Sequence, residues 1–240
     1  MNSFSNSESV QIWIIKFSDF SIYLPHLITI LSENEIRRSY EYKSEQNYYH
    51  FIISRAILRL LLAHYLEQDS KNITLIQTQY GKPKINSCNT INFNLTHSGE
   101  YCLLAFSRSS EIGIDLEYVN QSFKIEQAIN HICTVEEIDS WNHFSSLEKN
   151  ELFYKKWVCV EAFLKAHGVG WLADEDRIKQ AKNSVPYFPE HGYNTKFFNQ
   201  QPILLDIIQG YASALFVITP PFSIAFNNCK DLSRFLCEIL

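Results

Sequence analysis

Two acidic residues lie two positions apart in the segment EIGIDLEYV, where apolar and polar residues alternate. Alternate side chains of a β-strand point to opposite faces, so we expect the apolar residues on one face and Asp115 and Glu117 on the other. The two carboxylates would then be about 7 Å apart along the strand, within reach of one hard cation. Gly113, on the same face, would leave room for a bulky ligand. The alternative is an ordinary solvated strand face, because exposed acidic residues are common.

A second charged pair, Glu161 and Lys165, is four positions apart in a segment with helical periodicity. The apolar stripe of this helix is expected to consist of Phe153, Trp157, Val160 and Leu164. In isolation, Glu161 and Lys165 would make an exposed salt bridge that contributes about 0.3 to 0.5 kcal/mol. If Glu161 instead joined Asp115 and Glu117, Lys165 would contact a phosphate that shares the metal.

Two further segments offer candidate phosphate ligands. In Tyr80-Gly81-Lys82-Pro83, the proline forces Lys82 into an extended backbone and Gly81 tolerates a positive φ, so a stiff turn would present the ammonium. His97 follows the alternating segment INFNLT, and its ring could donate to phosphate. Each also has a simpler interpretation, as an isolated turn and as a structural or solvated histidine.

These segments form an ordered series between Tyr80 and Trp171: YGKPK, FNLTHSGEY, IGIDLE and FYKKWVCVEAFLKAHGVGW. The series resembles the 4′-phosphopantetheinyl transferases of the type that activate surfactin synthetase, whose motifs have the forms GKP, FNxSHS, (I/V)GxDxE and WxxKEAxxKxxG. A looser fit covers the helical region from Arg37 to Arg59. The resemblance implies an enzyme that moves 4′-phosphopantetheine from coenzyme A to a serine of an apo acyl or peptidyl carrier protein, releasing 3′,5′-ADP.

The resemblance also implies roles for individual residues. Asp115, Glu117 and Glu161 would bind magnesium against the coenzyme A diphosphate, a combination of carboxylates, phosphate and water that this ion prefers. Glu161 would take the serine proton, directly or through water, and Lys165 would steady the leaving phosphate. The implied coenzyme A ligands are Arg38, Gly81, Lys82, Pro83, Thr96, His97 and Lys165.

Two positions depart from the family motifs. Thr96 replaces a serine and keeps the hydroxyl, whereas Val160 stands where the motif has a lysine, directly before Glu161. The second departure removes a positive charge beside the expected metal ligand, and we hypothesise that Lys156, one turn earlier, partly replaces it.

Two other functions therefore compete with an active transferase. A degenerate protein could bind coenzyme A or a carrier without turnover. A metal-dependent phosphohydrolase is disfavoured because the sequence has no His-rich or multi-Asp cluster.

Both helices and strands are expected to position these residues, which gives an α+β class. Ser32 with Glu35 resembles a capping box at a helix start, and residues 46–67 have the periodicity of a long helix. Further helices are expected in FKIEQAINHI and LEKNELFYKKWVCVEAFLKAHG. Strands are expected in VQIWIIKF, ITLIQT, INFNLT, YCLLAF, EIGIDLEYV and as short segments in the last seventy or so residues.

The resemblance adds a domain arrangement to this class. It implies two similar halves related by a pseudo-twofold axis, each a small antiparallel sheet packed on helices, with coenzyme A between them. We place the boundary so that residues 1–107 form the nucleotide side and residues 108–240 the metal and carrier side. Carrier contacts are expected between Phe123 and Trp141, with Phe123, Lys124 and Ile125 as candidates.

Composition excludes several classes of protein. The chain has 240 residues, 46% of them hydrophobic, and a formal net charge of -5, which argues against a nucleic-acid partner. Six cysteines without CxxC spacing, and an N-terminus without signal-peptide features, predict buried thiols in a cytoplasmic protein. Arg55, Arg59 and His64 interrupt the longest apolar stretch, so no membrane span is expected. By analogy with the family, we expect a monomer.

Overall fold

The computed structural model describes residues 9–86, 91–171, 175–185, 201–219 and 223–228. Its strands are β1 (Ser9–Lys16), β2 (Leu75–Gln77), β3 (Pro83–Ile85), β4 (Asn92–Ser98), β5 (Tyr101–Ser107), β6 (Ile112–Tyr118), β7 (Ile203–Leu204), β8 (Tyr211–Val217) and β9 (Ser223–Asn227). Its α-helices are α1 (Leu24–Leu27), α2 (Glu33–Ser39), α3 (Glu45–Leu66), α4 (Ile129–Ile132), α5 (Val135–Ser140), α6 (Ser146–Ala166) and α7 (Glu175–Ser184).

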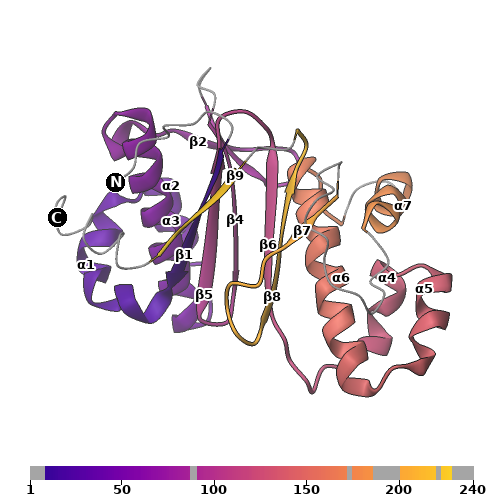
Figure 1. Ribbon diagram of the computed structural model, residues 1–240. Helices are drawn as coiled ribbons and strands as arrows, with labels where there is room; N and C mark the ends of the chain where they lie inside the picture. The colour runs from indigo at the N-terminus through magenta and orange to yellow at the C-terminus, as the bar shows by residue number, and fades with distance from the viewer. Residues whose placement is uncertain (1–8, 87–90, 172–174, 186–200, 220–222, 229–240) are drawn as a thin grey trace.

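Two sheets lie between two groups of helices (Figure 1). One sheet has the order β4-β5-β1-β9 and the other the order β6-β8-β7, and β2 and β3 form a separate pair. One hydrophobic cluster joins the four-stranded sheet to α3, and a second surrounds α6 and includes residues of β8. A third cluster contains residues of both sheets, including Ile112, Ile114 and Leu116 of β6. The α+β class is confirmed, and the apolar face of β6 is the one expected from its alternation.

The four-stranded sheet is not built from one continuous stretch of chain. β1 pairs antiparallel with β5, which pairs antiparallel with β4. β9, from near the end of the chain, lies parallel to β1 on its other side, with Ser9 opposite Ser223. The last strand of the described chain therefore returns to the first, which ties the ends of the fold together (Figure 1).

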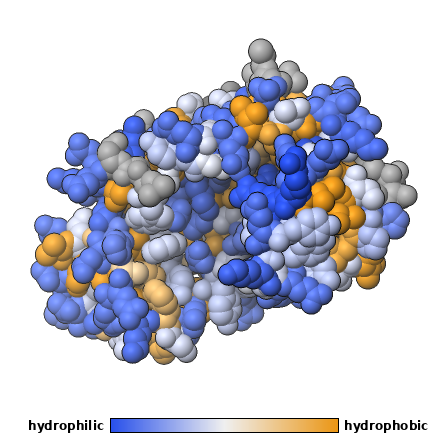
Figure 2. Space-filling view, turned by 180° about the vertical axis from the view of Figure 1, so that it is seen from behind, coloured by the Kyte–Doolittle hydropathy of each residue, from blue (hydrophilic) through white to orange (hydrophobic). Residues whose placement is uncertain are grey.

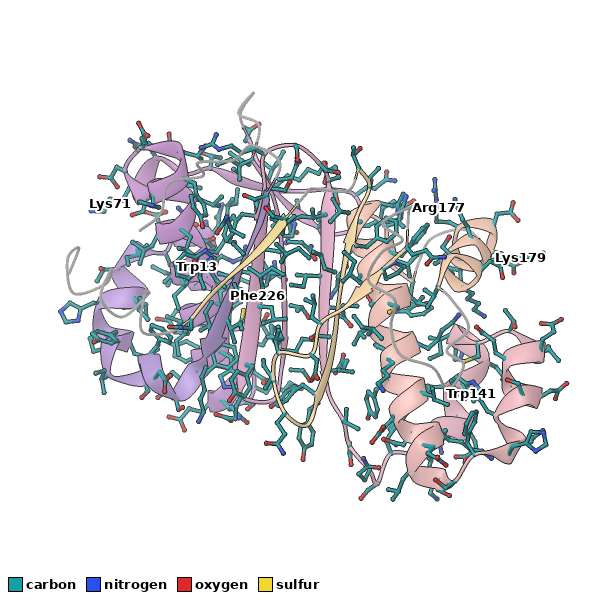
Figure 3. All side chains as sticks on the ribbon, in the orientation of Figure 1. Trp13, Lys71, Trp141, Arg177, Lys179 and Phe226 are labelled. Carbon is teal, nitrogen blue, oxygen red and sulfur yellow. The ribbon has the colours of Figure 1, made fainter. Side chains whose placement is uncertain are left out.

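Helix α3 covers the four-stranded sheet, and its ends are fixed locally. Ser44 caps its N-terminus by accepting from the backbone N–H of Asn47, and Glu67 ends it in the left-handed conformation. Trp13, which points from β1 toward this helix, donates from Nε1 to the hydroxyl of Tyr65 at 2.7 Å (Figure 3). The helix is therefore anchored to the sheet by a buried polar contact as well as by its apolar face.

The expected capping box of α2 is confirmed, and it has a second function. The Ser32 hydroxyl accepts from the backbone of Glu35, and the Glu35 carboxylate accepts from the backbone of Ser32. The same carboxylate binds Nε of the buried Arg59 at 2.6 Å. Arg59 thus joins α3 to α2 inside the protein, which explains how an apolar helix carries an arginine. Among the described helices, none is long and apolar enough to cross a membrane.

Two segments differ from the expected secondary structure. FKIEQAINHI forms only a short 3-10 helix (Ile125–Gln127) and the single turn α4. Ala128 lies outside the helical conformation between them, and α4 ends at Ile132 because Cys133 and Thr134, the N-cap of α5, have extended backbones. In the C-terminal region, where strands were expected, residues Glu175–Ser184 form α7. Its sequence, EDRIKQAKNS, has only two apolar residues, Ile178 and Ala181, so the apolar stripe that would mark the helix is short.

Three of the six cysteines lie in the described chain, and all three agree with the expectation of buried thiols. Cys102, Cys133 and Cys159 are buried and free. Cys88, Cys229 and Cys237 lie outside the described residues.

Candidate functional site

The candidate site lies where β4, the edge of one sheet, runs beside β6, the edge of the other. Side chains of β4, and not its backbone, make the hydrogen bonds to β6 described here. The Asn94 side-chain oxygen accepts from the backbone N–H of Ile114 at 2.8 Å. Two residues on, the buried Thr96 hydroxyl donates to Oδ1 of Asp115 at 3.0 Å. We call this line of contacts the β4–β6 seam.

Ser98 continues the same alternation at the end of the seam. Its hydroxyl donates to Oε2 of Glu117 at 2.9 Å and accepts from the backbone N–H of Tyr118 at 3.0 Å. Both acidic residues of β6 are therefore held by a hydroxyl of β4, at matching positions along the two strands. This fixed orientation is typical of a ligand site and is not a freely solvated strand face.

Helix α6 brings the remaining charges to the face of β6 that carries Asp115. Lys165 Nζ lies 2.5 Å from Oδ1 of Asp115 and 3.4 Å from the Thr96 hydroxyl. Burial opposes the charge of this lysine, but the Asp115 and Glu161 carboxylates outweigh it and raise the pKa of Lys165. Lys165 and Glu161 therefore belong to the site and do not form an isolated surface pair.

The site holds more negative than positive charge. Burial, followed by the neighbouring Asp115, raises the pKa of Glu117 to about 7. Burial also raises the pKa of Glu161, and Asp115 adds to that increase. Oδ2 of Asp115 is buried and has no hydrogen-bond partner. Among the described residues, Lys165 is bonded to Asp115 and lies in electrostatic range of Glu161 and Glu117, so three carboxylates surround one ammonium, an arrangement that an added cation would relieve.

The donor set fits a hard divalent ion, although the side chains do not yet surround one. Within the described part of the chain, no group of three acidic, histidine or cysteine side chains is close enough to hold a metal as it stands. The oxygens available are carboxylates, and one of them, Oδ2 of Asp115, lacks any partner. Magnesium prefers a few carboxylates and completes its shell with water or phosphate, so the chemistry of the residues is compatible with this ion.

Gly113 has a different function from the one expected. We expected the missing side chain to leave room for a ligand, but that space is filled by α6. A Cβ on Gly113 would lie 2.0 Å from the carbonyl oxygen of Ala162 and 2.4 Å from the backbone nitrogen of Ala166. The glycine therefore lets the helix that carries Glu161 and Lys165 approach β6.

The hypothesis that Lys156 replaces a charge near Glu161 is wrong. Lys156 is buried, and its Nζ binds Oε1 of Glu137 at 2.7 Å. It also donates to the carbonyls of Lys182 at 2.8 Å and Val185 at 3.1 Å, at the end of α7. Lys156 points into the packing of α6 with α5 and α7. Its ammonium is fully used there.

Val160 belongs to the core, as the predicted apolar stripe requires. Its side chain is fully buried, as are those of Phe153 and Leu164, whereas Trp157 is partly buried. A lysine at position 160 would therefore enter the hydrophobic cluster of α6.

The turn that contains Gly81, Lys82 and Pro83 forms as expected, but its lysine is turned inward. Gly81 has a φ of +83°, and Thr78 accepts from its backbone N–H at 2.9 Å. Lys82 Nζ binds Oε2 of Glu111 at 3.0 Å and the carbonyl of Ile112 at 3.1 Å. Burial lowers the pKa of Lys82 more than the Glu111 carboxylate raises it. The ammonium is thus tied to the start of β6, near the beginning of the seam.

The two remaining expected coenzyme A ligands, His97 and Arg38, lie in the N-terminal half of the chain. Phe17 stacks on His50 at 3.7 Å and meets the ring of His97 edge-on at 6.5 Å. Burial lowers the pKa of His97, with His50 and Lys165 adding to the effect, so His97 lies within electrostatic range of the site. Arg38 is exposed on α2, with its guanidinium 5.8 Å from the ring centre of Phe51, and none of the described contacts joins it to the carboxylates.

The candidate carrier contacts divide by exposure. Phe123 and Lys124 are exposed, whereas Ile125 is buried and belongs to the cluster around α6. Ile125 is therefore not available as a surface contact. Trp141, at the other end of the segment, is buried between the short helices and α6 (Figure 3). On the face seen in Figure 2, hydrophilic side chains predominate and apolar side chains gather in separate patches.

Two residues of the site were missed in the sequence. Ser98 lies in the quoted segment FNLTHSGEY, and its spacing from Asn94 and Thr96 is a signal that could have indicated a shared function. Trp171 donates from its indole Nε1 to Oε1 of Glu161. Nothing in the local sequence around Trp171 indicates this contact, because it depends on how the chain turns after α6.

Two family models match most of the chain. A sequence model for the N-terminal part of 4′-phosphopantetheinyl transferases matches residues 18–109. A model for the 4′-phosphopantetheinyl transferase superfamily matches residues 111–204.

Individual relatives point in the same direction. A putative 4′-phosphopantetheinyl transferase of Synechocystis sp. is 28% identical over 188 residues, which are 76% of this chain and 76% of the relative. The 4′-phosphopantetheinyl transferase HetI of Nostoc sp. is 29% identical over 167 residues, 68% of this chain and 70% of the relative. The 4′-phosphopantetheinyl transferase ffp of Bacillus subtilis is 24% identical over 206 residues, 82% of this chain and 86% of the relative.

Proposed function

The chain belongs to the 4′-phosphopantetheinyl transferase superfamily, and we propose that it transfers 4′-phosphopantetheine from coenzyme A to a serine of an apo acyl or peptidyl carrier protein. The observation that carries this proposal is the excess of carboxylates at the β4–β6 seam. Asp115, Glu117 and Glu161 share one ammonium there, and one buried carboxylate oxygen has no partner. Such a site gains stability when a cation and a phosphorylated substrate bind together.

Magnesium is the ion that fits this donor set best. Asp115, Glu117 and Glu161 would hold it, and when bound it neutralises negative charge on the diphosphate of coenzyme A. Thr96 and Ser98 orient the first two carboxylates through their hydroxyls. Because these hydroxyls belong to the other sheet, the seam joins the two sheets beside the carboxylates that are proposed as metal ligands.

The transfer itself needs one proton acceptor and one stabilised leaving group. The serine oxygen of the carrier forms a bond to the phosphorus next to pantetheine, and the bond from that phosphorus to the bridging oxygen breaks. The serine proton passes to Glu161, whose raised pKa suits a general base. 3′,5′-ADP leaves with the electron pair, and the Lys165 ammonium donates a hydrogen bond to a phosphate oxygen.

The remaining assignments follow from this placement. Arg38, Gly81, Lys82, Pro83, Thr96 and His97 are proposed to line the coenzyme A site, with Lys82 held near it by Glu111. Contacts of Thr96 and His97 with the 3′-phosphate are proposed from the family motif; the two side chains lie on opposite faces of β4, with Thr96 toward Asp115 and His97 beside Phe17. Carrier contacts are proposed at Phe123 and Lys124. We propose a monomeric, cytoplasmic enzyme with coenzyme A and a carrier as partners and with no nucleic-acid or membrane partner.

We further propose the type that activates surfactin synthetase, with two similar halves. The presence of a long helix against a sheet in each half, α3 and α6, supports a pseudo-twofold relation (Figure 1). The boundary between residues 107 and 108 follows the junction of β5 with β6, although β9 crosses back to the first sheet.

The direct test is a carrier-panel assay. Purified protein, magnesium, coenzyme A and apo carriers of fatty-acid, polyketide and peptide-synthetase type are incubated, and intact mass is measured. We expect at least one carrier to become heavier by one phosphopantetheine, and Glu161→Gln to abolish the gain. If the wild-type protein modifies none of these carriers, the proposed function is wrong.

Two controls separate the alternatives. Calorimetry that shows coenzyme A binding without transfer to any carrier would favour a degenerate binding protein. Release of phosphate from coenzyme A without a carrier would favour a phosphohydrolase.

A further inference from the structure

The segment after α6 folds back onto the helix and brings Trp171 to Glu161. Gly168 adopts the left-handed conformation at φ +68°. Its backbone N–H donates to the carbonyl of Lys165 at 3.1 Å, and that of Val169 donates to the carbonyl of Leu164 at 3.0 Å. These two bonds are the Schellman arrangement, which reverses the chain at the end of a helix. Because the chain reverses, residues just beyond the helix can return to its own surface.

Trp171 is held on that surface by packing. Its ring centre lies 5.5 Å from that of Trp157, with 41° between the ring planes. Trp157 and Glu161 are four residues apart on α6 and therefore neighbours on one face. From this position over Trp157, Nε1 of Trp171 donates to Oε1 of Glu161, one turn further along the helix.

The chemistry of this contact fixes one oxygen of the carboxylate. The indole N–H is a donor only, and an ionised carboxylate is an acceptor only, so the contact has one possible direction. Trp171 occupies Oε1 and leaves Oε2 for a second partner. Hydroxyls of β4 hold the carboxylates of Asp115 and Glu117, whereas among the described contacts no strand hydroxyl binds Glu161. Trp171 supplies the equivalent donor from the segment after the helix.

We propose that Trp171 is a positioning residue that fixes Glu161 by one oxygen and thereby presents the other oxygen to the metal and to the serine hydroxyl of the carrier. The inference rests on the proposed function of Glu161 as metal ligand and base. Trp171 does not itself touch the reacting atoms. Its removal should therefore reduce kcat and metal affinity and leave the KM for coenzyme A nearly unchanged.

The test compares Trp171→Phe with Trp13→Phe in the full chain. Both variants keep an aromatic ring and remove an indole N–H that donates a hydrogen bond, but only the N–H of Trp171 binds Glu161, whereas that of Trp13 binds Tyr65. We expect Trp171→Phe to lower kcat about tenfold, as expected for a hydrogen bond to a charged group, and to weaken Mn²⁺ binding measured by electron paramagnetic resonance titration. In the folded protein, Trp13→Phe should change neither by more than about twofold. Equal effects of the two variants would overturn the inference.

A double-mutant cycle separates positioning from a general structural effect. Mn²⁺ affinity is measured for Trp171→Phe in the wild-type and in the Glu161→Gln background. If Trp171 acts through Glu161, its substitution has little further effect once the carboxylate is gone. The same decrease in both backgrounds would show that Trp171 only supports the fold. Because this titration needs no carrier, it judges the inference even if the carrier-panel assay finds no transfer.

Discussion

Two lysines of the same helix, Lys156 and Lys165, show how α6 supports the fold at one place and the site at another. Lys156 is buried with one carboxylate, Glu137, and two carbonyl oxygens, so its charge is matched within the protein. Lys165 faces Asp115, with Glu117 and Glu161 in electrostatic range, so negative charge remains in excess. The comparison teaches that a balanced buried pair indicates a structural role, whereas an unbalanced one indicates a place for a ligand.

Removing one of the carboxylates around Lys165 should have the largest effect on kcat. We expect Asp115→Asn to lower kcat about 10³-fold, because it weakens metal binding worth several kcal/mol. The Asn can still accept from Thr96 and from Lys165, whose ammonium keeps Glu161 and Glu117 in electrostatic range, so the free energy of unfolding without magnesium should fall by no more than about 1 kcal/mol. Transfer assays and urea denaturation measure the two quantities. Asp176→Asn on α7, which is exposed and lies outside both the seam and the expected carrier segment, is the matched control and should be neutral.

Breaking the balanced pair should affect stability instead. Lys156→Met would leave the Glu137 carboxylate and two carbonyls without their buried partner, so we expect the free energy of unfolding to fall by about 3–5 kcal/mol. The kcat of the folded fraction should stay near that of the wild type. If kcat fell and stability did not, Lys156 would act at the proposed metal site after all. Urea denaturation followed by circular dichroism supplies the stability measurement.

A lysine at position 160 tests whether a further positive charge on α6 acts in the core or at the carboxylates around Lys165. Val160 is fully buried in the core, so Val160→Lys would bring an unpaired ammonium into an apolar cluster. We expect a loss of about 3 kcal/mol of stability and no gain in transfer. Increased transfer by this variant would instead show that the missing family lysine limits activity. Val160→Met, which is apolar and similar in length, controls for size.

Magnesium should raise the Tm only when the carboxylates around Lys165 are intact. At a concentration about 100 times the dissociation constant, ligand binding adds about 2.7 kcal/mol to the free energy of unfolding. We expect magnesium to raise the Tm of the wild type and of Lys156→Met, and to raise that of Glu117→Gln less. Scanning calorimetry with magnesium chloride, against sodium chloride at equal ionic strength, tests this. An equal shift in all three proteins would place the ion elsewhere.

Much of the fold and part of the site were accessible from local patterns. The capping box at Ser32 depends on residues three apart, and the two faces of β6 follow from strict alternation. Helix α7 was missed because only two apolar residues, Ile178 and Ala181, mark its apolar stripe. The partners of Lys156 and Lys82 could not be predicted, because a charged side chain shows its type in the sequence but not the distant residue that it meets.

The sequence by itself determined which residues carry charge, which face of β6 is apolar, and the order of motifs that indicates the superfamily. These features depend on spacing along the chain, which periodicity fixes. Only the tertiary structure decided that Gly113 admits a helix and not a ligand, that Ser98 and Trp171 hold Glu117 and Glu161, and that Lys156 lies in the core. Each of these depends on a contact between distant segments, and the geometry of such a contact exists only after the chain has packed.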